Sequence, residues 1–206
     1  MIQAQHHRLF YPFLVWYSQR IVTKNFARVQ INHTVALQNT SLLVIANHTS
    51  WWDGFWIHEL VTRVFKRKFF FMMLEDQLRK SRFLKYFGGF SIKKNSRSII
   101  ESLTYSAQLL QNPANAVLIF PQGRLESLYT QDFIFDKGVE VILKKTESTQ
   151  IVFVVNLIEY LSHSKPTLYV YTSVYGYSDT SVTALQYAYT EFYKSCIINH
   201  QKSMIE

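Results

Sequence analysis

A histidine and an aspartate, His48 and Asp53, stand five residues apart directly after the apolar run at residues 42–46. A buried strand that ends in polar, reactive side chains is where α/β enzymes usually place their chemistry. Histidine takes up a proton near neutral pH, and a neighbouring carboxylate fixes the tautomer of the ring and stabilises its protonated form. The pair therefore predicts a general base that activates a hydroxyl or amine nucleophile, which the substrate supplies.

The same spacing also has a purely structural explanation. Asn47, Thr49 or Ser50 can cap the N-terminus of a helix, and Asp53 is favourable in its first turn. Five residues on a straight helix turn through about 500°, which leaves the two side chains about 140° apart. A contact between His48 and Asp53 thus requires His48 on the turn between strand and helix, with Asp53 in or near the first helical turn.

Two later segments also end predicted strands in polar loops. The apolar run at residues 115–120 ends in a Pro-Gln-Gly-Arg loop at 121–124. Proline stops a strand ladder, and glycine permits close approach of a ligand to the backbone. Residues 86–94 combine a glycine turn, a short strand and the basic pair Lys93 and Lys94. Two strand ends therefore carry polar loops, and a third carries lysines.

In order and spacing, these segments resemble the first three sequence blocks of the glycerolipid and lysophospholipid acyltransferases. The blocks are a histidine and an aspartate separated by four residues at 48–53, the Gly-Gly-Phe-Ser-Ile-Lys-Lys stretch at 88–94, and Phe-Pro-Gln-Gly at 120–123. Phe-Asp-Lys-Gly at 135–138 is similar to a stretch that often follows the third block. The resemblance covers residues 25–160 and implies a glycerolipid acyltransferase-like α/β fold.

The resemblance implies transfer of an acyl group from a thioester, acyl-CoA or acyl carrier protein, to a hydroxyl or amine of a lipid, with no bound cofactor or metal. His48 is then the general base and Asp53 its partner, and the backbone of Gly123 is the candidate donor to the oxyanion. The residues expected to contact the substrate are Asn47, Lys93, Lys94, Gln122 and Arg124.

The chain departs from the family pattern in the third and fourth blocks. The third block usually reads Phe-Pro-Glu-Gly-Thr-Arg, whereas Gln122 replaces the glutamate and Arg124 stands one position before the expected arginine. In the family this arginine and the basic residue of the second block, here Lys94, are associated with the phosphate of the acceptor. The proline usual in the fourth block is absent from residues 151–156. Lysophospholipid, glycolipid and aminolipid acceptors therefore all remain open.

The composition predicts an anionic partner. The chain of 206 residues carries 22 Lys and Arg against 14 Asp and Glu, a net charge of +8, and 16% of its residues are aromatic. Basic and aromatic residues suit an anionic membrane surface and also a nucleic-acid groove. A nucleic-acid-binding module leaves the His-Asp and Phe-Pro-Gln-Gly blocks unexplained, so we expect a membrane and no nucleic acid. The single Cys196 excludes an intrachain disulfide and is interpreted as a structural or surface thiol.

We expect residues 1–24 to be an amphipathic, membrane-associating segment and residues 25–206 to be one acyltransferase domain. The apolar stretch at 9–17 is rich in aromatics and flanked by Arg8 and Arg20, but it is too short to cross a bilayer. A helix packed on the domain is an equal alternative. With no secretory signal evident, the protein is expected to be peripheral or monotopic on the cytoplasmic face of a membrane.

Strands that alternate with helices predict a mixed, largely parallel central sheet with helices on both faces. Besides the short strand before Lys93, strands are expected at residues 27–37 (an edge strand or hairpin), 42–46, 69–73, 115–120, 152–157 and 168–175. Helices are expected at residues 52–65, 75–87, 96–111, 137–145 and 181–200.

Two other functions are compatible with the sequence. In a thioesterase or lipid hydrolase, His48 would activate water in place of a lipid acceptor. In a non-catalytic lipid- or nucleic-acid-binding protein, the altered third block would have lost its chemistry. Acyl transfer that depends on a lipid acceptor distinguishes an acyltransferase from both of these alternatives.

Overall fold

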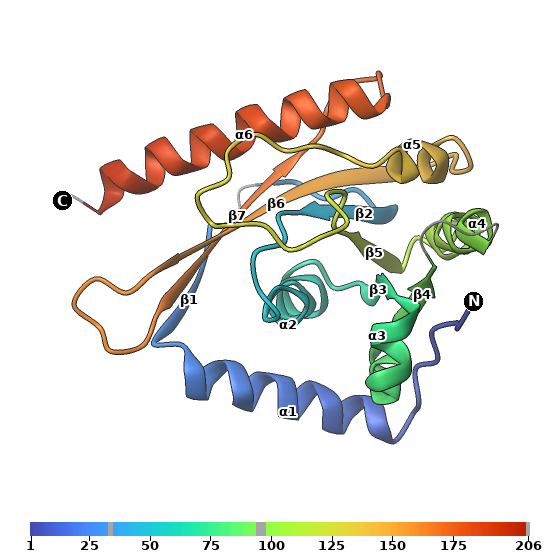
Figure 1. The fold of residues 1–206 in the computed structure, drawn as a ribbon, viewed down its shortest axis with the longest axis horizontal. Coiled ribbons are helices and arrows are strands. Elements are labelled where there is room, and N and C mark those ends of the chain that lie inside the picture. Colours follow the sequence, from blue (N-terminus) through green and yellow to red (C-terminus); the bar gives the residue numbers. More distant parts are fainter. Residues whose placement is uncertain (33–34, 94–97, 205–206) are drawn as a thin grey trace.

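The computed structural model describes residues 1–32, 35–93 and 98–204. Seven strands form one sheet in the order β1-β7-β6-β2-β5-β3-β4 (Figure 1). All neighbours from β6 to β4 are parallel, β7 is antiparallel to β6, and β1 pairs parallel with β7 at the edge. The mixed, largely parallel sheet predicted from the sequence is confirmed.

The elements follow the predicted order. The strands are β1 (Arg28–Asn32), β2 (Ser41–Ala46), β3 (Lys68–Leu74), β4 (Gly89–Ile92), β5 (Asn115–Ile119), β6 (Thr149–Glu159) and β7 (Thr167–Val174). The helices are α1 (Phe10–Asn25), α2 (Asp53–Glu59) with the π-helical turn η1 (Leu60–Val64), α3 (Glu75–Lys80) with the 3-10 segment η2 (Arg82–Phe87), α4 (Ser98–Leu110), α5 (Gly138–Leu143) and α6 (Val182–Ser203).

The expectation of one continuous helix at residues 75–87 is wrong. The α-helix ends at Lys80, with Ser81 as its C-cap, and the chain continues as η2 up to Gly88, which has φ 102°. A Cβ at Gly88 would lie 2.2 Å from the carbonyl oxygen of Phe69, because the chain here turns tightly against β3 before β4 begins. Only glycine fits such a turn, and the tighter 3-10 geometry brings the chain into it.

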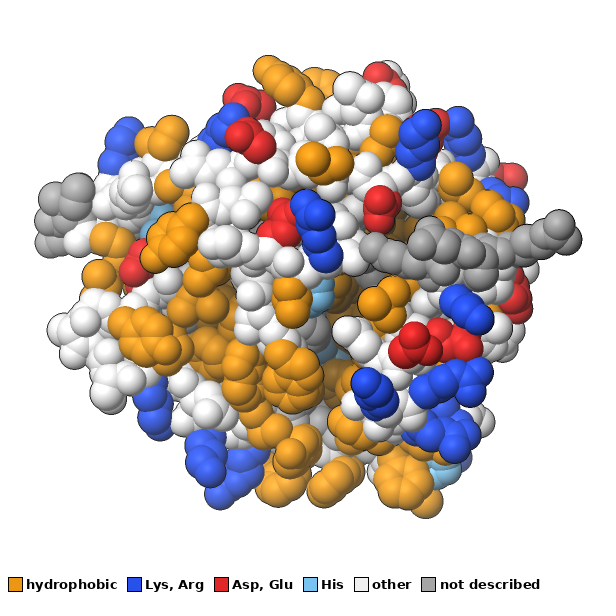
Figure 2. Space-filling view, viewed as in Figure 1, with side chains coloured by type: hydrophobic (Ala, Val, Ile, Leu, Met, Phe, Trp, Pro, Cys, Tyr) orange, Lys and Arg blue, Asp and Glu red, His pale blue; other side chains and the backbone are white. Residues whose placement is uncertain are grey.

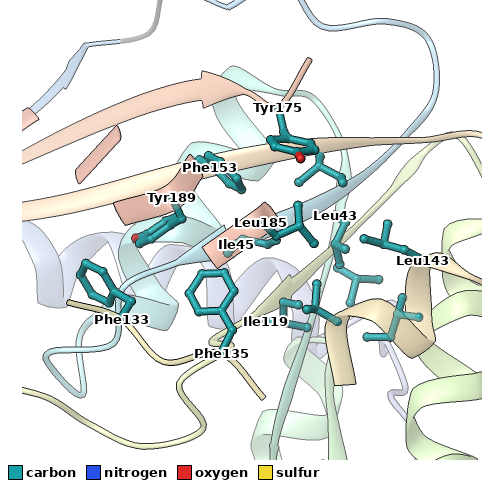
Figure 3. Close-up of a cluster of buried hydrophobic side chains, with 14 of the residues drawn as sticks. Leu43, Ile45, Ile119, Phe133, Phe135, Leu143, Phe153, Tyr175, Leu185 and Tyr189 are labelled. Atoms are coloured by element: carbon teal, nitrogen blue, oxygen red, sulfur yellow. The ribbon is translucent and has the colours of Figure 1, made fainter. Parts of the chain in front are cut away.

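Helices cover both faces of the sheet (Figure 1). On one face α4, α5 and α6 pack on alternate strand residues such as Leu43, Ile45 and Ile119 (Figure 3). On the other face α1, α2 and η1 pack on the intervening residues, Leu42 and Val44 among them. Because side chains of a strand alternate between faces, the continuous apolar run of β2 fills both cores at once.

The carboxyl ends of β2 and β5 form a topological switch point. The two strands are parallel neighbours whose last paired residues are Ile45 and Ile119. The chain leaves β2 for α2 on one face of the sheet and leaves β5 for α5 on the other. Connections that diverge in this way open a crevice at the strand ends, where α/β proteins bind ligands. The histidine block and the Pro-Gln-Gly block follow these two strands, so the fold brings them together.

The N-terminal segment begins beside β4, the edge strand farthest from β1. The backbone N–H of Ile2 donates to Ser91 Oγ at 2.7 Å, beside β4, and α1 then crosses the α2 face of the domain (Figure 1). Only Ser18 and Val22 of α1 are buried. None of the described helices is long and apolar enough to span a membrane.

Two histidines, the half-buried His6 and the buried His58, hold this segment in place. The His6 ring donates through Nε2 to the carbonyl of Phe69 at 3.0 Å, and His58 Nε2 shares a hydrogen bond of 3.2 Å with the hydroxyl of Tyr11. Burial, together with nearby Lys68, lowers the pKa of His6 to about 4. Burial, together with His6, lowers the pKa of His58 to about 3. Both rings are therefore neutral in the folded protein at neutral pH.

Acid should therefore weaken the folded state through His58. The unfolded chain binds a proton on this residue below its ordinary pKa of 6.5, whereas the folded protein does so only near 3. The stabilisation is thus complete above pH 6.5 and declines by about 1.4 kcal/mol per pH unit below it. We expect His58→Gln to flatten the dependence of the unfolding free energy on pH between 6.5 and 4.5, measured by urea denaturation. The control is His163→Gln at an exposed position, and equal slopes in wild type and His58→Gln would refute the assignment.

Candidate active site

His48 and Asp53 form a hydrogen-bonded pair at the carboxyl end of β2. His48 lies in the loop after the strand and Asp53 is the first residue of α2, as the spacing argument required. The distance from His48 Nδ1 to Asp53 Oδ2 is 2.8 Å, with the histidine side chain 26% exposed and the aspartate side chain fully buried. Since the carboxylate only accepts, Nδ1 carries the proton, and Nε2 is the ring nitrogen with a free lone pair.

Asp53 also organises the loop that carries the histidine. Its Oδ2 accepts from the backbone N–H groups of Thr49 at 2.7 Å and of Ser50 at 2.9 Å. Asp53 lies in the first turn of α2, as the structural explanation expected, but the N-cap residue is Trp52, whose side chain does not cap the helix. The same carboxylate closes the turn before α2 and orients the imidazole.

Phe120 fixes the plane of the histidine ring from the neighbouring strand end. The two ring centroids are 4.0 Å apart and the planes differ by 10°, a stacked arrangement. Asp53 at one ring nitrogen and Phe120 on one face together restrict the imidazole to one orientation. Such restriction is what general-base catalysis needs, because the base must reach a proton at hydrogen-bond distance.

The Gly123 N–H, the predicted oxyanion donor, has a partner within the protein, and its contact with an oxyanion stays a prediction. The N–H donates to the carbonyl oxygen of Phe120 at 3.0 Å and closes the turn after β5. Gly123 has φ 65°, a conformation that favours glycine, so the residue serves the turn. Its N–H can reach a ligand only if this turn opens.

Two predicted substrate contacts, Asn47 and Gln122, hydrogen-bond to the main chain, and their contact with the substrate stays a prediction. Asn47 is buried, and its side chain donates to the carbonyl and accepts from the N–H of Asn156 on β6, at 3.0 and 2.9 Å. Gln122 is also buried, and its Oε1 accepts from the His48 N–H at 3.1 Å. Both amides are committed to the main chain because buried backbone groups require partners where a strand ladder ends.

Two of the predicted basic contacts, Arg124 and Lys93, follow different strands, β5 and β4. The Arg124 side chain is 70% exposed and its Nε donates to Glu126 Oε1 at 2.9 Å. Lys93 is exposed just after β4, at the same edge of the sheet as His48. Since β5 and β3 separate β4 from β2, about 14 Å lies between these strand ends. Lys94 lies outside the described residues.

Glu126 joins the site although the sequence did not single it out. Its backbone N–H donates to the His48 carbonyl at 2.8 Å, and its Oε2 accepts from Gln122 Nε2 at 2.5 Å. The available signal was its spacing of four residues from Gln122, just beyond the recognised block. Phe120 was quoted in that block, but nothing in the sequence indicated that it stacks on the imidazole.

The described residues contain no group of three or more His, Cys, Asp and Glu side chains that could hold a metal ion. Cys196 is buried on α6, and burial raises the pKa of its thiol to about 12. The interpretation of this residue as a structural thiol agrees with that setting, because the reactive form of cysteine is the thiolate.

The model of the Acyltransferase family matches residues 27–170. The chain therefore belongs to the Acyltransferase family, and the resemblance drawn from the sequence blocks is confirmed at this level. No curated protein sequence matches the chain.

Among solved structures, the chain is similar to PlsC, the 1-acyl-sn-glycerophosphate acyltransferase of Thermotoga maritima. The TM-score is 0.61 at 18% sequence identity, over 92% of this chain and 79% of that one. At this identity the likeness concerns the fold. The KaiC-like protein PH0186 of Pyrococcus horikoshii OT3 reaches a TM-score of only 0.30 at 12% identity, over 69% of this chain and 81% of that one, and carries no argument.

The double role of Asp53 separates two substitutions at this position. Asp53→Ala removes the acceptor of three hydrogen bonds and should lower the unfolding free energy by about 3–5 kcal/mol. Asp53→Asn keeps one oxygen for the same donors and should cost clearly less. Urea denaturation measures both, with Asp76→Ala in the exposed first turn of α3 as control. Equal losses for Ala and Asn would mean that the charge, and not the hydrogen bonds, holds the loop.

Proposed function

We propose that the protein transfers an acyl group from a thioester, acyl-CoA or acyl carrier protein, to a hydroxyl or amine of a lipid acceptor. The observation that carries this proposal is the His48–Asp53 pair, held at 2.8 Å at the switch point of an Acyltransferase-family domain. The Nε2 lone pair points away from the carboxylate, where an acceptor hydroxyl can approach. A hydrolase that uses the same pair would show no dependence on the acceptor.

In the proposed reaction, His48 Nε2 takes the proton of the acceptor hydroxyl while its oxygen attacks the thioester carbonyl carbon. The tetrahedral intermediate collapses with cleavage of the C–S bond, and the leaving thiolate takes the proton back from the imidazolium. The buried Asp53 carboxylate stabilises the imidazolium between these steps and keeps the proton on Nδ1. The acceptor hydroxyl takes the place that a serine has in a catalytic triad.

The exposed cations are the proposed contacts of the substrates. Arg124 follows the same loop as Gln122, close to His48, and a guanidinium is suited to phosphate. Lys93 lies farther along the sheet edge, and with Lys94 it could contact the phosphates of the donor or an anionic headgroup. A lysophospholipid, a glycolipid and an aminolipid all supply the required nucleophile, so the acceptor must be identified by experiment.

The decisive measurement is thiol release from acyl-CoA and acyl carrier protein in the presence of a panel of lipid acceptors, with products identified by mass spectrometry. We expect release only with an acceptor, and a loss of about 10²–10⁴-fold in rate for His48→Ala, since that is the usual contribution of a general base. His163→Ala, at an exposed histidine, is the matched control. Release at the same rate without acceptor would identify a hydrolase, and an unchanged rate for His48→Ala would refute the mechanism.

We further propose that the α1 face of the protein binds an anionic membrane surface. The aromatic groove, about 390 Å³ in volume, lies between α1 and η2 and is lined by Phe10, Phe13, Leu14, Tyr17, Phe83 and Tyr86. Beside it lies the basic pocket, to which Arg79, Arg82 and Lys85 contribute their side chains. Figure 2 shows hydrophobic side chains gathered over this side, with Lys and Arg side chains next to them.

The 3-10 geometry of η2 explains how one short segment serves both surfaces. Residues three apart lie in line on a 3-10 helix, so Arg82 and Lys85 share one side while Phe83 and Tyr86 share the next. Apolar rings that enter the acyl region next to cations at the headgroups are the arrangement of an interfacial protein. A peripheral position is therefore proposed for the domain, with the cytoplasmic face still the expectation from the sequence.

Vesicle flotation tests this placement. Phe13→Ser and Phe83→Ser should each weaken binding to vesicles of phosphatidylcholine and phosphatidylglycerol by at least about tenfold, because each removes an apolar ring from the interface. Arg82→Gln with Lys85→Gln should weaken binding only when anionic lipid is present. Tyr187→Ser, at an exposed tyrosine of α6 on the other face, is the control. Binding unchanged in all α1 and η2 variants would place the membrane contact elsewhere or exclude it.

A further inference from the structure

The N–H and the carbonyl of His48 both form hydrogen bonds with the loop after β5. Its N–H donates to Gln122 Oε1 at 3.1 Å, and its carbonyl accepts from the Glu126 N–H at 2.8 Å. The Glu126 side chain then closes the ring of contacts, because its Oε2 accepts from Gln122 Nε2. Gln122 is buried, and the Glu126 side chain is 11% exposed.

The chemistry of this ring gives Glu126 a directional role. A glutamine amide can turn over by 180° and present either its oxygen or its NH2 group to a neighbour. A carboxylate only accepts, so Glu126 forces Nε2 of Gln122 toward itself and Oε1 toward the His48 N–H. If the amide turned over, two donors would face each other at His48 and two acceptors at Glu126. The carboxylate therefore selects the orientation of Gln122 that can hold the histidine backbone.

We propose that Glu126 is a positioning residue of the active site, which acts on His48 through Gln122. The family pattern has a carboxylate at the position of Gln122 itself, where it could accept from the His48 N–H directly. In this chain an amide takes that position, and the negative charge stands four residues later. The kinetic part of this inference rests on the proposed acyl transfer.

An exchange of the two side chains tests the inference. In Gln122→Glu/Glu126→Gln, the glutamate at 122 can accept from the His48 N–H and from the amide at 126, so the contacts of the ring and the net charge remain. The amide oxygen at 126 can still accept from Arg124, in place of the ion pair. Gln122→Glu alone places two carboxylates in contact, and Glu126→Ala releases the amide to turn over. We expect near wild-type kcat for the double variant and a loss of about 10- to 100-fold for each of these two single variants, with the thioester KM within about twofold.

A second readout does not depend on activity. Hydrogen exchange of the His48 amide, followed by NMR, should accelerate by about tenfold or more in Glu126→Ala and return toward wild type in the double variant. Glu140→Ala removes a comparable half-buried carboxylate, paired with Lys144 on α5, and should change neither readout. Glu126→Gln keeps an acceptor oxygen for Gln122 and should give an intermediate result, which keeps the test informative if Glu126→Ala does not fold.

The outcomes separate the inference from the proposed function. Unchanged His48 exchange in Glu126→Ala, or a double variant as impaired as the single ones, would overturn the positioning role. Wild-type protein without acyl transfer would refute the proposed function, while the exchange measurement would still decide whether Glu126 holds His48.

Discussion

The site depends on one buried carboxylate. Asp53 has no exposed surface, and one of its oxygens collects the imidazole N–H and two peptide N–H groups within 2.7–2.9 Å. Burying an ion costs several kcal/mol, and hydrogen bonds to a charged group each return about 1.5–3 kcal/mol. All three donors come from a single turn, so the loop must wrap around the carboxylate to offset its burial. The position of His48 follows from that wrapping.

The sheet brings the loop that carries His48 next to the loop after β5. β2 and β5 end side by side, but their connections depart to opposite faces of the sheet. The two loops therefore meet at the strand ends, where they hydrogen-bond to each other, without being packed by the same helix. The histidine loop is anchored by α2. The loop after β5 is held by α6, where Tyr193 donates its hydroxyl to the carbonyl of Leu128 at 3.1 Å and stacks edge-on against Phe133. The geometry of the site therefore depends on helices from both sides of the sheet.

The features that could be predicted from the sequence are those that depend on a local pattern of residues. The apolar run of β2, the five-residue spacing and the alternation of strands and helices were sufficient for the fold class and for the His48–Asp53 contact. The partner of Asn47 is Asn156, 109 residues away, and no local pattern shows that an amide will complete a ladder between β2 and β6. The predicted contact of Asn47 with the substrate stays a prediction. The sequence also did not show that Gln122 and Gly123 hydrogen-bond within the protein, where polar groups at strand ends satisfy the backbone.

In the rearranged third block, the proposed acceptor-binding residue and the residue that positions His48 contact different atoms of Glu126. Family members carry a glutamate and an arginine in the order Glu-Gly-Thr-Arg, whereas this chain carries Arg124 before Glu126. The sum of the charges is the same, but here the two carboxylate oxygens have different partners: Oε2 holds Gln122 and Oε1 holds the exposed guanidinium. An anionic acceptor that binds Arg124 would replace only Oε1 as the partner of the guanidinium. The contact that orients Gln122, and through it the backbone of His48, does not involve Oε1. Under the proposed function, a phosphate bound at Arg124 would therefore leave the position of His48 unchanged.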